Sequence, residues 1–477
     1  MAEQADRVPW TPQLVRVMAG LMLSLFVAAM DATVVGTALP TIARDLGRFE
    51  LYPWIVSGYL ITATTTVPIW GRLADIHGRR RTLMLGTAIF VIASVLCAAS
   101  PSMEWLIAFR TLQGIGAGCI QPVVFTVVGD IFPLRQRARL QGLFSGMWAV
   151  AAIIGPGLGA LFVSTIGWRW IFTVNLPIGI IAASLIWGYR ERRPESAGAR
   201  SLEYRGTVLL TAGIVLLLFG LGTGNATATP SWPLAAAAAV VLIAFGVVES
   251  RSANPTVPLD LLRHRVIGPA VLVAVLGGTV MFAVFAYIPL WVQGVQGASA
   301  YAAGVAVGAM SIGWPVTSAV AGWIMVRVGY TRLVVAGALL LLVGSLMLAL
   351  GSPDLGVAWT AAATIVLGAG MGFFSAPLLI VIQSNVEWGR RGAATALNQF
   401  ARTIGGAVGV SLMGVLLQSF VRSARDPLHA RVQLAAGLHA DYVVMVVLSV
   451  LVLATGVAIL VTSRRSAQQP ATVAASS

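Results

Sequence analysis

The chain has 477 residues, of which 58% are hydrophobic and only 10% charged, and its mean hydropathy is +0.87. Soluble domains average about 45–50% apolar and about 25% charged residues, so the composition excludes a soluble enzyme. The net charge is +14, and all 31 basic residues are arginines. These arginines lie in short clusters between apolar runs, which favours a role in membrane topology over nucleic-acid binding.

Apolar runs long enough to cross a bilayer follow one another along the chain, and we count fourteen of them. They lack the alternation of apolar and polar residues that transmembrane strands show over about ten positions. The sequence therefore predicts an all-α polytopic membrane protein. Its fourteen spans are expected at 15–39, 53–71, 82–99, 105–128, 140–163, 169–188, 206–223, 233–248, 267–292, 302–325, 332–350, 357–382, 396–420 and 441–462.

The arginines predict the orientation of these spans. If the N-terminus is cytoplasmic, 23 arginines fall in cytoplasmic segments, six fall outside and two lie within spans. Because basic residues are enriched in cytoplasmic loops, both termini are expected in the cytoplasm, in agreement with an even number of spans. We predict a multi-pass protein of the cell inner (cytoplasmic) membrane. The abundance of Ala, Gly and Arg without lysine indicates a bacterial source.

Polar stretches and an internal repeat predict the domain organisation. Gly71 and Gly78 stand seven residues apart before basic residues and a new helix, and so do Gly322 and Gly329. Duplicated bundles are typical of transporters, whose binding sites lie between the two halves near the membrane midplane. The expected units are an N-terminal six-helix bundle (1–190), cytoplasmic linkers with two extra transmembrane helices (191–265), a C-terminal six-helix bundle (266–465) and a disordered cytoplasmic tail (466–477).

Ionisable residues inside spans indicate function, because each costs about 2.5–3.5 kcal/mol to place in the membrane. Three are expected, Asp31, Arg110 and Arg402, with Asp31 the sole buried carboxylate. Helical rise places Asp31 and Arg110 at comparable depth, so they are expected to face one another. A helix movement that changes their separation would bind or release a proton. The alternatives are a static ion pair that locks two helices together, or no contact.

Glycines and a proline mark two further segments. Gly114 and Gly118 follow Arg110 on one helix face, where small residues let another helix approach closely. They would hold the arginine in a tight groove or serve simple packing. The segment 155–159 (GPGLG) places Pro156 inside a span, where proline kinks a helix. This kink would form a flexible seam at the central cavity or be an ordinary membrane-helix kink.

The loop 71–81 places Asp75 before a helix N-terminus, where a carboxylate is favourable, followed by three arginines that are not. These arginines are expected to serve orientation, lipid headgroups or a salt bridge to Asp75. The loop is therefore either a clamp between neighbouring helices or a topological signal alone.

These segments together resemble the major facilitator superfamily, and in particular its fourteen-span drug/proton antiporter family. The order and spacing of the motifs carry the resemblance, which extends over the whole chain. The matching segments are MDATVVGTALPTIARDL (30–46), GRLADIHGRRRTLML (71–85), RTLQGIGAG (110–118), GPGLGALF with GWRWIFTVNLPIG (155–179) and RGAATALNQFARTIGGAVGVSLMG (391–414).

The resemblance implies a major facilitator fold and a proton-coupled antiporter that exports amphipathic drugs or hydrophobic metabolites by alternating access. Val326 occupies the acidic position in the second-half loop, so only the first half is expected to carry a clamp. The implied roles are proton coupling for Asp31 and Arg110, a gate loop of Gly71, Asp75, Gly78, Arg79 and Arg80, and an antiporter motif of Gly155, Pro156 and Gly159.

Polar and aromatic residues within spans are candidates for the substrate cavity, because amide and aromatic groups suit amphipathic ligands. Most of them are expected to be packing or interfacial residues instead. No carboxylate is expected within the spans of the later bundle, which favours neutral or anionic amphipaths, or monovalent cations recognised by Asp31. The candidates are Gln121, Trp148, Tyr287, Trp291, Gln293, Trp314, Phe373, Phe374, Gln383, Asn398 and Arg402.

Other functions remain as alternatives. The first is an uncoupled facilitator or importer of a small solute on the same fold. A polytopic membrane enzyme is disfavoured because His/Asp/Glu clusters are absent, and ATP-driven transport because the chain has no GxxxxGK[ST] loop. We expect no metal or cofactor, with the proton motive force as the energy source. The expected partners are the small-molecule substrate, protons and membrane lipids, with no nucleic acid or obligate protein partner, and a monomeric state.

Overall fold

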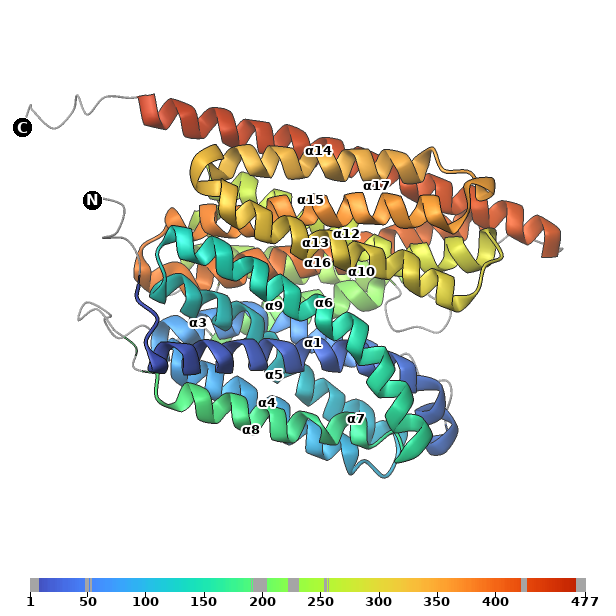
Figure 1. The fold of residues 1–477 in the computed structure, drawn as a ribbon, viewed down its shortest axis with the longest axis horizontal. Coiled ribbons are helices and arrows are strands. Elements are labelled where there is room, and N and C mark those ends of the chain that lie inside the picture. The colour runs from blue at the N-terminus through green and yellow to red at the C-terminus, as the bar shows by residue number, and fades with distance from the viewer. Residues whose placement is uncertain are drawn as a thin grey trace, which may run out of the picture.

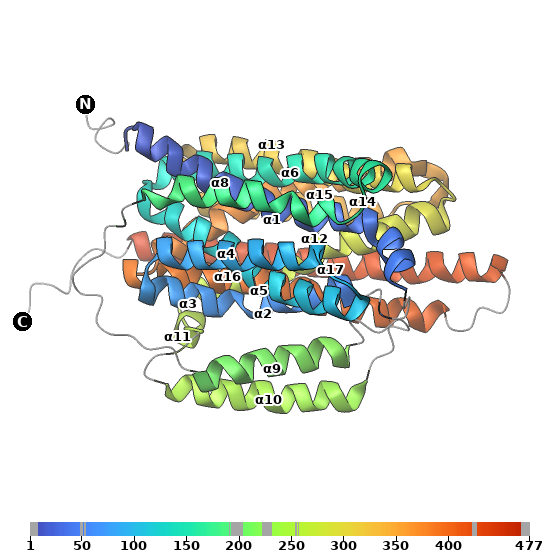
Figure 2. The same cartoon turned by 90° about the horizontal axis from the view of Figure 1, so that it is seen from below.

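The computed structural model describes residues 8–47, 51, 54–189, 191, 204–221, 231–252, 255, 257–421 and 427–468. Over these residues all regular secondary structure is helical. The helices run along one long axis and form two bundles that lie side by side (Figure 1). The start of α1 and the end of α17 lie at the same end of the molecule, which we call the terminal end (Figures 1 and 2).

Two expected spans of the N-terminal bundle are each broken into two helices. The break at Thr66 is followed by Pro68 in the first turn of α3, and the break at Val174 by Pro177 in the first turn of α8. Proline lacks an N–H group and fits the first turn of a helix, so these breaks follow from its chemistry. The bundle comprises α1 (Pro12–Leu46), α2 (Trp54–Thr65), α3 (Val67–His77), α4 (Arg79–Ala98), α5 (Met103–Ile131), α6 (Leu134–Thr165), α7 (Trp170–Thr173) and α8 (Asn175–Trp187).

Two helices between the bundles, α9 (Tyr204–Gly220) and α10 (Trp232–Arg251), form a hairpin at the edge of the molecule (Figure 2). The hairpin meets the N-terminal bundle at α2, where the Trp54 and Phe219 ring centroids lie 4.8 Å apart. The short helix α11 (Leu259–Leu262) then leads into the C-terminal bundle.

The last helix of the C-terminal bundle is longer than expected. It begins at Pro427 instead of 441, because residues 427–440 are rich in alanine and leucine, which favour helix. It also continues to Gln468, so residues 466–468 of the expected tail are helical, while 469–477 lie outside the described residues. The bundle comprises α12 (Ile267–Leu290), a π-helical turn (Trp291–Val295), α13 (Ala300–Val328), α14 (Tyr330–Ala349), a 3-10 turn (Pro353–Leu355), α15 (Gly356–Ser384), a 3-10 turn (Trp388–Arg390), α16 (Arg391–Val421) and α17 (Pro427–Gln468).

The internal repeat extends to the backbone conformation. Gly78 precedes α4 with φ +94° and ψ 150°, and Gly329 precedes α14 with φ +92° and ψ 142°. Residues other than glycine rarely adopt this φ. The second glycine of each repeat therefore supplies the same turn at corresponding places in the two bundles.

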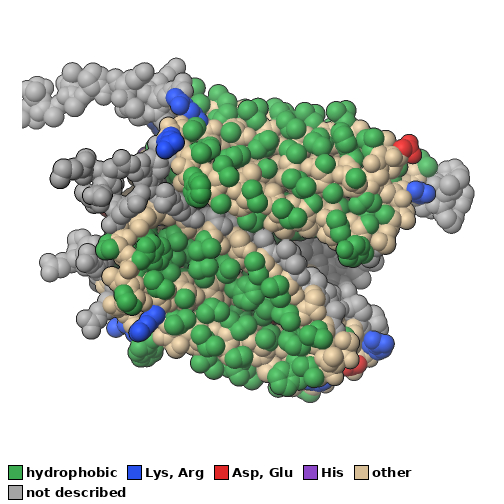
Figure 3. Space-filling view, viewed as in Figure 1, with side chains coloured by type: hydrophobic (Ala, Val, Ile, Leu, Met, Phe, Trp, Pro, Cys, Tyr) green, Lys and Arg blue, Asp and Glu red, His purple; other side chains and the backbone are tan. Residues whose placement is uncertain are grey.

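The surface of the molecule matches a membrane environment. Eleven helical segments of described residues are long and apolar enough to cross a membrane. Figure 3 shows a face covered by apolar side chains along the length of the helices, with charged side chains near the two ends. Large exposed apolar residues of the described chain include Ile180 and Trp323, which are 57% and 73% exposed. The chain is therefore a multi-pass membrane protein.

Close packing of α4 on α5 generates a stability prediction. A Cβ at Gly116 would lie 2.5 Å from the Phe90 amide nitrogen and 2.7 Å from the Gly86 carbonyl oxygen, whereas Gly157 on α6 faces open space. Overpacking typically costs about 1–3 kcal/mol, so Gly116→Ala should lower the free energy of unfolding by about that amount. Gly157→Ala should leave it unchanged or raise it, because alanine favours helix by about 1 kcal/mol. Unfolding of the detergent-solubilised protein measures both, and equal effects would contradict the packing described.

Candidate functional site: a buried ion pair, an end latch and a central cavity

An ion pair lies inside the N-terminal bundle. The Asp31 Oδ2 atom on α1 lies 2.6 Å from the Arg110 Nη1 atom on α5. Asp31 is 1% exposed and Arg110 is 2% exposed. The structure thus brings together the two residues that were expected at comparable depth in the membrane, and it places them away from bulk water.

Two amide side chains complete the surroundings of Asp31. Gln113 accepts a hydrogen bond from Arg110 Nη1 at 2.6 Å and donates one to Asp31 Oδ1 at 3.0 Å. Asn175 on α8 donates to the same Asp31 oxygen at 2.9 Å and to Ser94 Oγ on α4 at 3.1 Å. Four helices therefore meet at one carboxylate, both of whose oxygens accept hydrogen bonds from the protein.

The Tyr59 side chain separates this ion pair from the space between the bundles. Its ring centroid lies 4.2 Å from the Arg110 guanidinium carbon, which is a cation–π contact. Tyr59 also lines the central cavity described below, whereas Asp31 and Arg110 do not. Access from the cavity to the ion pair therefore depends on the position of Tyr59.

The glycines after Arg110 explain why Tyr59 lies where it does. A Cβ at Gly114 would lie 2.4 Å from the Tyr59 carbonyl oxygen, and a Cβ at Gly118 would lie 2.6 Å from that of Ala63. The absence of side chains lets α2 approach α5 closely. The tight groove expected around Arg110 is thus formed by α2.

The segment 155–159 packs against α1 close to Asp31. A Cβ at Gly155 would lie 2.1 Å from Thr33 Oγ1, and the Thr33 hydroxyl lies 3.0 Å from the Ala151 carbonyl oxygen, to which it donates. Gly159 is buried on the same helix, and α6 stays helical through Pro156. The contact between α1 and α6 therefore lies within two residues of Asp31 along α1.

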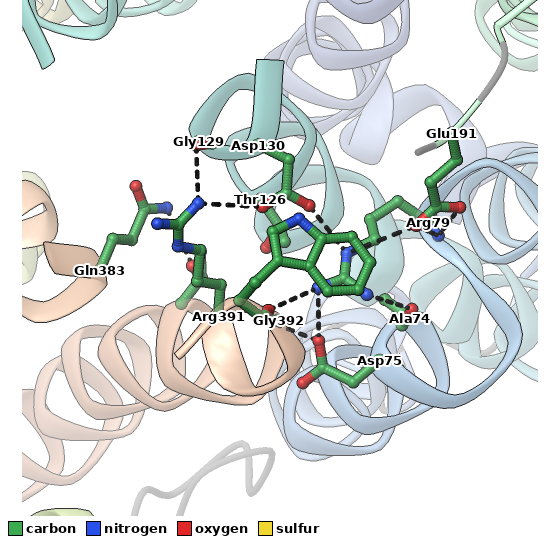
Figure 4. Close-up of polar contacts among 12 residues, drawn as sticks. Ala74, Asp75, Arg79, Thr126, Gly129, Asp130, Glu191, Gln383, Arg391 and Gly392 are labelled. Atoms are coloured by element: carbon green, nitrogen blue, oxygen red, sulfur yellow. Dashed lines mark hydrogen bonds and ion pairs between the residues drawn. The ribbon is translucent and has the colours of Figure 1, made fainter. Parts of the chain in front are cut away.

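A set of polar contacts joins the two bundles at the terminal end, and we call it the latch. Asp75 at the end of α3 accepts hydrogen bonds from the Gly392 amide at 3.0 Å and the Ala393 amide at 2.8 Å (Figure 4). These are amides of the first turn of α16, so Asp75 caps a helix of the opposite bundle. Gly71 permits this approach, since a Cβ there would lie 2.2 Å from Ala396 Cβ.

Arg79 lies at the centre of the latch and is fully buried. Its Nη2 atom lies 2.8 Å from Asp75 Oδ1 and 3.1 Å from the Trp388 carbonyl oxygen, and its Nε atom lies 3.0 Å from Asp130 Oδ2. From the opposite bundle, Arg391 reaches Asp130 at 3.5 Å. Figure 4 shows Arg79 between these carboxylates, with Glu191 beside it. Arginines of both bundles and the carboxylates Asp75 and Asp130 of the N-terminal bundle thus form one network.

One residue of the expected gate loop lies outside the latch. The Arg80 guanidinium carbon lies 5.3 Å from the centroid of the Trp187 ring, within the N-terminal bundle. Successive residues of a helix point in different directions, so Arg79 faces inward and Arg80 cannot. Gly78 contributes through its positive φ, which allows α4 to begin directly after α3.

Burial changes the proton affinity of the latch carboxylate. It raises the pKa of Asp75 from 3.8 to about 6, although the Arg79 charge and the two backbone hydrogen bonds act in the opposite direction. If the bundles separated at this end, water would reach Asp75 and return its pKa towards 3.8. The closed latch therefore binds a proton more readily than an open one.

A cavity of about 330 Å³ lies between the two bundles and is lined by both of them. Six of the residues proposed from the sequence line it: Gln121, Trp148, Trp314, Phe374, Asn398 and Arg402. Among the described lining residues there is no aspartate or glutamate. The cavity is thus largely apolar and aromatic, with a few polar groups, as expected for an amphipathic ligand.

The other proposed cavity residues lie elsewhere, and packing or hydrogen bonding uses the side chains of all but Gln293 among them. Tyr287 donates its hydroxyl to the Val410 carbonyl oxygen, and Trp291 packs edge-on against Tyr442. Gln293 is exposed, and Phe373 packs in a small cluster with Met325 and Ile380. Gln383 lies near the latch, where its Nε2 atom donates to Thr395 Oγ1 at 3.0 Å and to the Phe125 carbonyl oxygen at 3.3 Å.

Several functional residues were missed from the sequence. Gln113 stands three residues after Arg110, so a polar side chain one turn from a buried arginine was a usable signal. Gln399 offered the same signal, because it stands three residues before Arg402. The others come from segments distant in sequence, which no spacing reveals. The missed residues are Tyr59, Ser94, Gln113 and Asn175 at the ion pair, Asp130, Glu191, Trp388 and Arg391 at the latch, and Ser375 and Gln399 at the cavity.

A further carboxylate corrects the expectation that Asp31 is the sole buried acid within the spans. Asp441 lies within an apolar segment of α17 and is fully buried. Neither of its carboxylate oxygens has a hydrogen-bond partner. The expected span began at Asp441 itself, so this residue was not counted as lying within a span. The helix begins fourteen residues earlier, at Pro427.

Comparison with known proteins decides the family. The model of the Major Facilitator Superfamily matches residues 21–410. The chain belongs to this superfamily. Over 406 residues it is 34% identical to "Multidrug transporter protein MdtP" and 32% identical to "Multidrug resistance protein 3", both of Bacillus subtilis. These matches cover 84% of this chain, and 74% and 79% of the two relatives.

Fungal relatives and solved structures agree with the family. The chain is 33% identical over 428 residues to "Efflux pump dotC" of Dothistroma septosporum, covering 86% of this chain and 73% of that protein. The human organic anion transporter MFSD10 has the same fold, with a TM-score of 0.68, 16% identity, and coverage of 94% of this chain and all of that one. The proton:xylose symporter XylE aligns with a TM-score of 0.63 at 14% identity, covering 91% and 94% of the two chains. This superfamily member is a transporter and not an enzyme.

The latch generates a prediction that combines a substitution with pH. Arg79→Gln leaves Asp75, Asp130 and Glu191 close together without their shared cation, and breaking a buried ion pair costs about 3–5 kcal/mol. At about pH 7.5 the variant should lose most of its closed form. Lowering the pH below about 6 should restore closure in part, because the closed form binds a proton at Asp75 more readily.

Spin labels at His77 and Glu387, two exposed positions on opposite sides of the latch, report this equilibrium as a distance distribution. The two native cysteines are buried and do not compete for labelling. Arg80→Gln is the matched control, since it removes a neighbouring charge that contacts Trp187 instead. A short distance that is equally populated in wild type and Arg79→Gln at neutral pH would contradict the role of Arg79.

Proposed function

We propose that this protein is a proton-coupled antiporter that exports amphipathic drugs or hydrophobic metabolites across the cytoplasmic membrane by alternating access. The observation that carries the proposal is the buried Asp31–Arg110 ion pair, with Tyr59 between it and the cavity. Drug efflux is supported by relatives named as multidrug transporters and efflux pumps.

We further propose fourteen membrane crossings with both termini in the cytoplasm. Taking α2 with α3 and α7 with α8 as single crossings gives fourteen among the described helices, and α17 ends on the side where α1 begins (Figure 1). Arg79, Arg80 and Arg81, one of the arginine clusters expected in the cytoplasm, begin α4 at the terminal end. In this orientation the latch closes the cytoplasmic side of the protein.

The proposed coupling step follows from the cost of separating buried charges. Removing one partner from a buried pair leaves an uncompensated charge that costs about 3–5 kcal/mol. Separating the ionised pair leaves two such charges, whereas separation after Asp31 takes up a proton leaves only the Arg110 guanidinium, which the Tyr59 ring contacts, so protonation lowers the cost of the movement. Gln113 and Asn175 are suited to hold the carboxyl group in place in either protonation state, because amides both donate and accept hydrogen bonds.

The closed latch and the intact ion pair belong to one state in this scheme. Substrate leaves the cavity on the outer side, and a proton that reaches Asp31 past Tyr59 weakens its attraction to Arg110. The resulting movement of α1 against α5 and α6 opens the latch and closes the outer side. Proton release to the cytoplasm then restores the ion pair, so that proton influx drives export.

Asp31→Asn should abolish coupling while leaving the amide contacts in place. In proteoliposomes with an imposed pH gradient, we expect the variant to lose uphill transport of a fluorescent amphiphile by at least about tenfold, equivalent to about 1.4 kcal/mol. Downhill exchange of the same probe should continue. The double variant Asp31→Asn with Arg110→Gln has no unpaired buried charge and serves as a second test if the single variant is unstable.

Glu104→Gln is the matched control, because Glu104 is an exposed carboxylate on the same helix as Arg110. It should transport like wild type. Substrate-linked proton movement that survives in Asp31→Asn would overturn the assignment of Asp31. Transport by wild type without any proton flux would favour the uncoupled facilitator.

A further inference from the structure

The wall that the C-terminal bundle contributes to the cavity contains polar atoms without partners. Arg402 on α16 donates to Gln399 Oε1 at 2.7 Å, while its Nε atom is buried without a hydrogen-bond partner. Asn398 stands one turn earlier on the same helix and is 7% exposed, and its Oδ1 atom is also buried without a partner. Ser375 Oγ on α15 is in the same state. All three residues line the cavity.

The charge of this wall is unbalanced. Among the described residues no carboxylate lies within 4.0 Å of Arg402, in contrast to Arg79 and Arg110, which are paired at 2.8 Å and 2.6 Å. A guanidinium in a membrane interior is costly unless an anion or several acceptors surround it. Its only hydrogen bond to a side chain among the described residues is to a neutral amide. The site is therefore electrostatically complete only when a negative charge enters the cavity.

The rest of the cavity selects the body of such a ligand. Phe282, Phe285 and Trp314 line it from the C-terminal bundle, and Tyr59 and Trp148 from the N-terminal bundle. A volume of about 330 Å³ admits one compact drug-sized molecule. Aromatic walls favour a flat apolar body, and the unpartnered Asn398 oxygen accepts an N–H or O–H group next to the anion.

We propose that Arg402, Asn398 and Ser375 form the headgroup subsite for an amphipathic organic anion, with the apolar body of the ligand between the two bundles. The proposal rests on the proposed export function and specifies its substrate class. It also separates two tasks: the N-terminal bundle holds the proton at Asp31, and the C-terminal bundle holds the negative charge of the substrate at Arg402. Different residues therefore bind the coupling proton and the negative charge of the substrate.

Three probes with one fluorescent body and different charges test this subsite. Dansylglycine is an anion, dansylamide is neutral and dansylcadaverine is a cation at neutral pH. Binding to the detergent-solubilised full chain is read from dansyl fluorescence, which requires no proton gradient. Wild type should bind dansylglycine at least about tenfold more tightly than dansylcadaverine, since hydrogen bonds to charged groups contribute about 1.5–3 kcal/mol.

Substitutions at the subsite should reduce this preference for the anion to different extents. Arg402→Gln should remove the preference for the anion, and Arg402→Lys should retain most of it. Asn398→Asp places a carboxylate beside the guanidinium and should weaken dansylglycine binding while leaving or improving dansylcadaverine binding. Arg44→Gln removes an exposed arginine of α1 and should match wild type. Melting temperatures of all variants separate loss of the site from loss of the fold.

The outcomes distinguish the subsite from the transport function. If wild type does not prefer dansylglycine, or if Arg402→Gln keeps the preference, the anion subsite is wrong, whatever the coupling experiments show. If dansylglycine binds as expected but its transport is not linked to protons, the subsite stands and the antiport function falls.

Discussion

The ion pair between Asp31 and Arg110 is the constraint on which the rest of the structure depends. Two charges in a membrane interior are tolerated only together and with their hydrogen bonds satisfied. The protein meets this requirement by bringing α1, α4, α5 and α8 together around one carboxylate. Glycines on α5 then let α2 approach, so that Tyr59 covers the guanidinium. The same contacts that stabilise the N-terminal bundle thus surround the residue proposed to carry the coupling proton.

At the terminal end, the latch also pairs buried charges, but here the contacts join the two bundles. Arg79 is shared by carboxylates of its own bundle, while Asp75 caps a helix of the other one. This arrangement joins the bundles by polar contacts at the terminal end. Because the contacts are polar, water can replace them when the bundles separate. A latch of this kind suits the alternating access that we propose.

The sequence predicted much of the fold for physical reasons that can be named. Apolar length and arginine clusters identify the spans, and paired glycines before a helix identified the repeat that Gly78 and Gly329 share. Asp31 and Arg110 stood out because charges within spans are rare. The breaks at Thr66 and Val174 and the long α17 were missed, since hydropathy alone does not register helix ends. Asp130, Trp388 and Arg391 could not be assigned to the latch, because the two halves meet only in three dimensions.

Proton release on substrate binding tests the central claim, that Asp31 carries the coupling proton, most directly. In lightly buffered detergent solutions over a series of pH values, saturating dansylglycine should release up to about one proton per wild-type molecule where Asp31 is protonated before the probe binds, because a bound substrate and a protonated Asp31 exclude one another in an antiporter. Asp31→Asn should bind the same probe and release none. Equal proton release by wild type and variant would contradict the account.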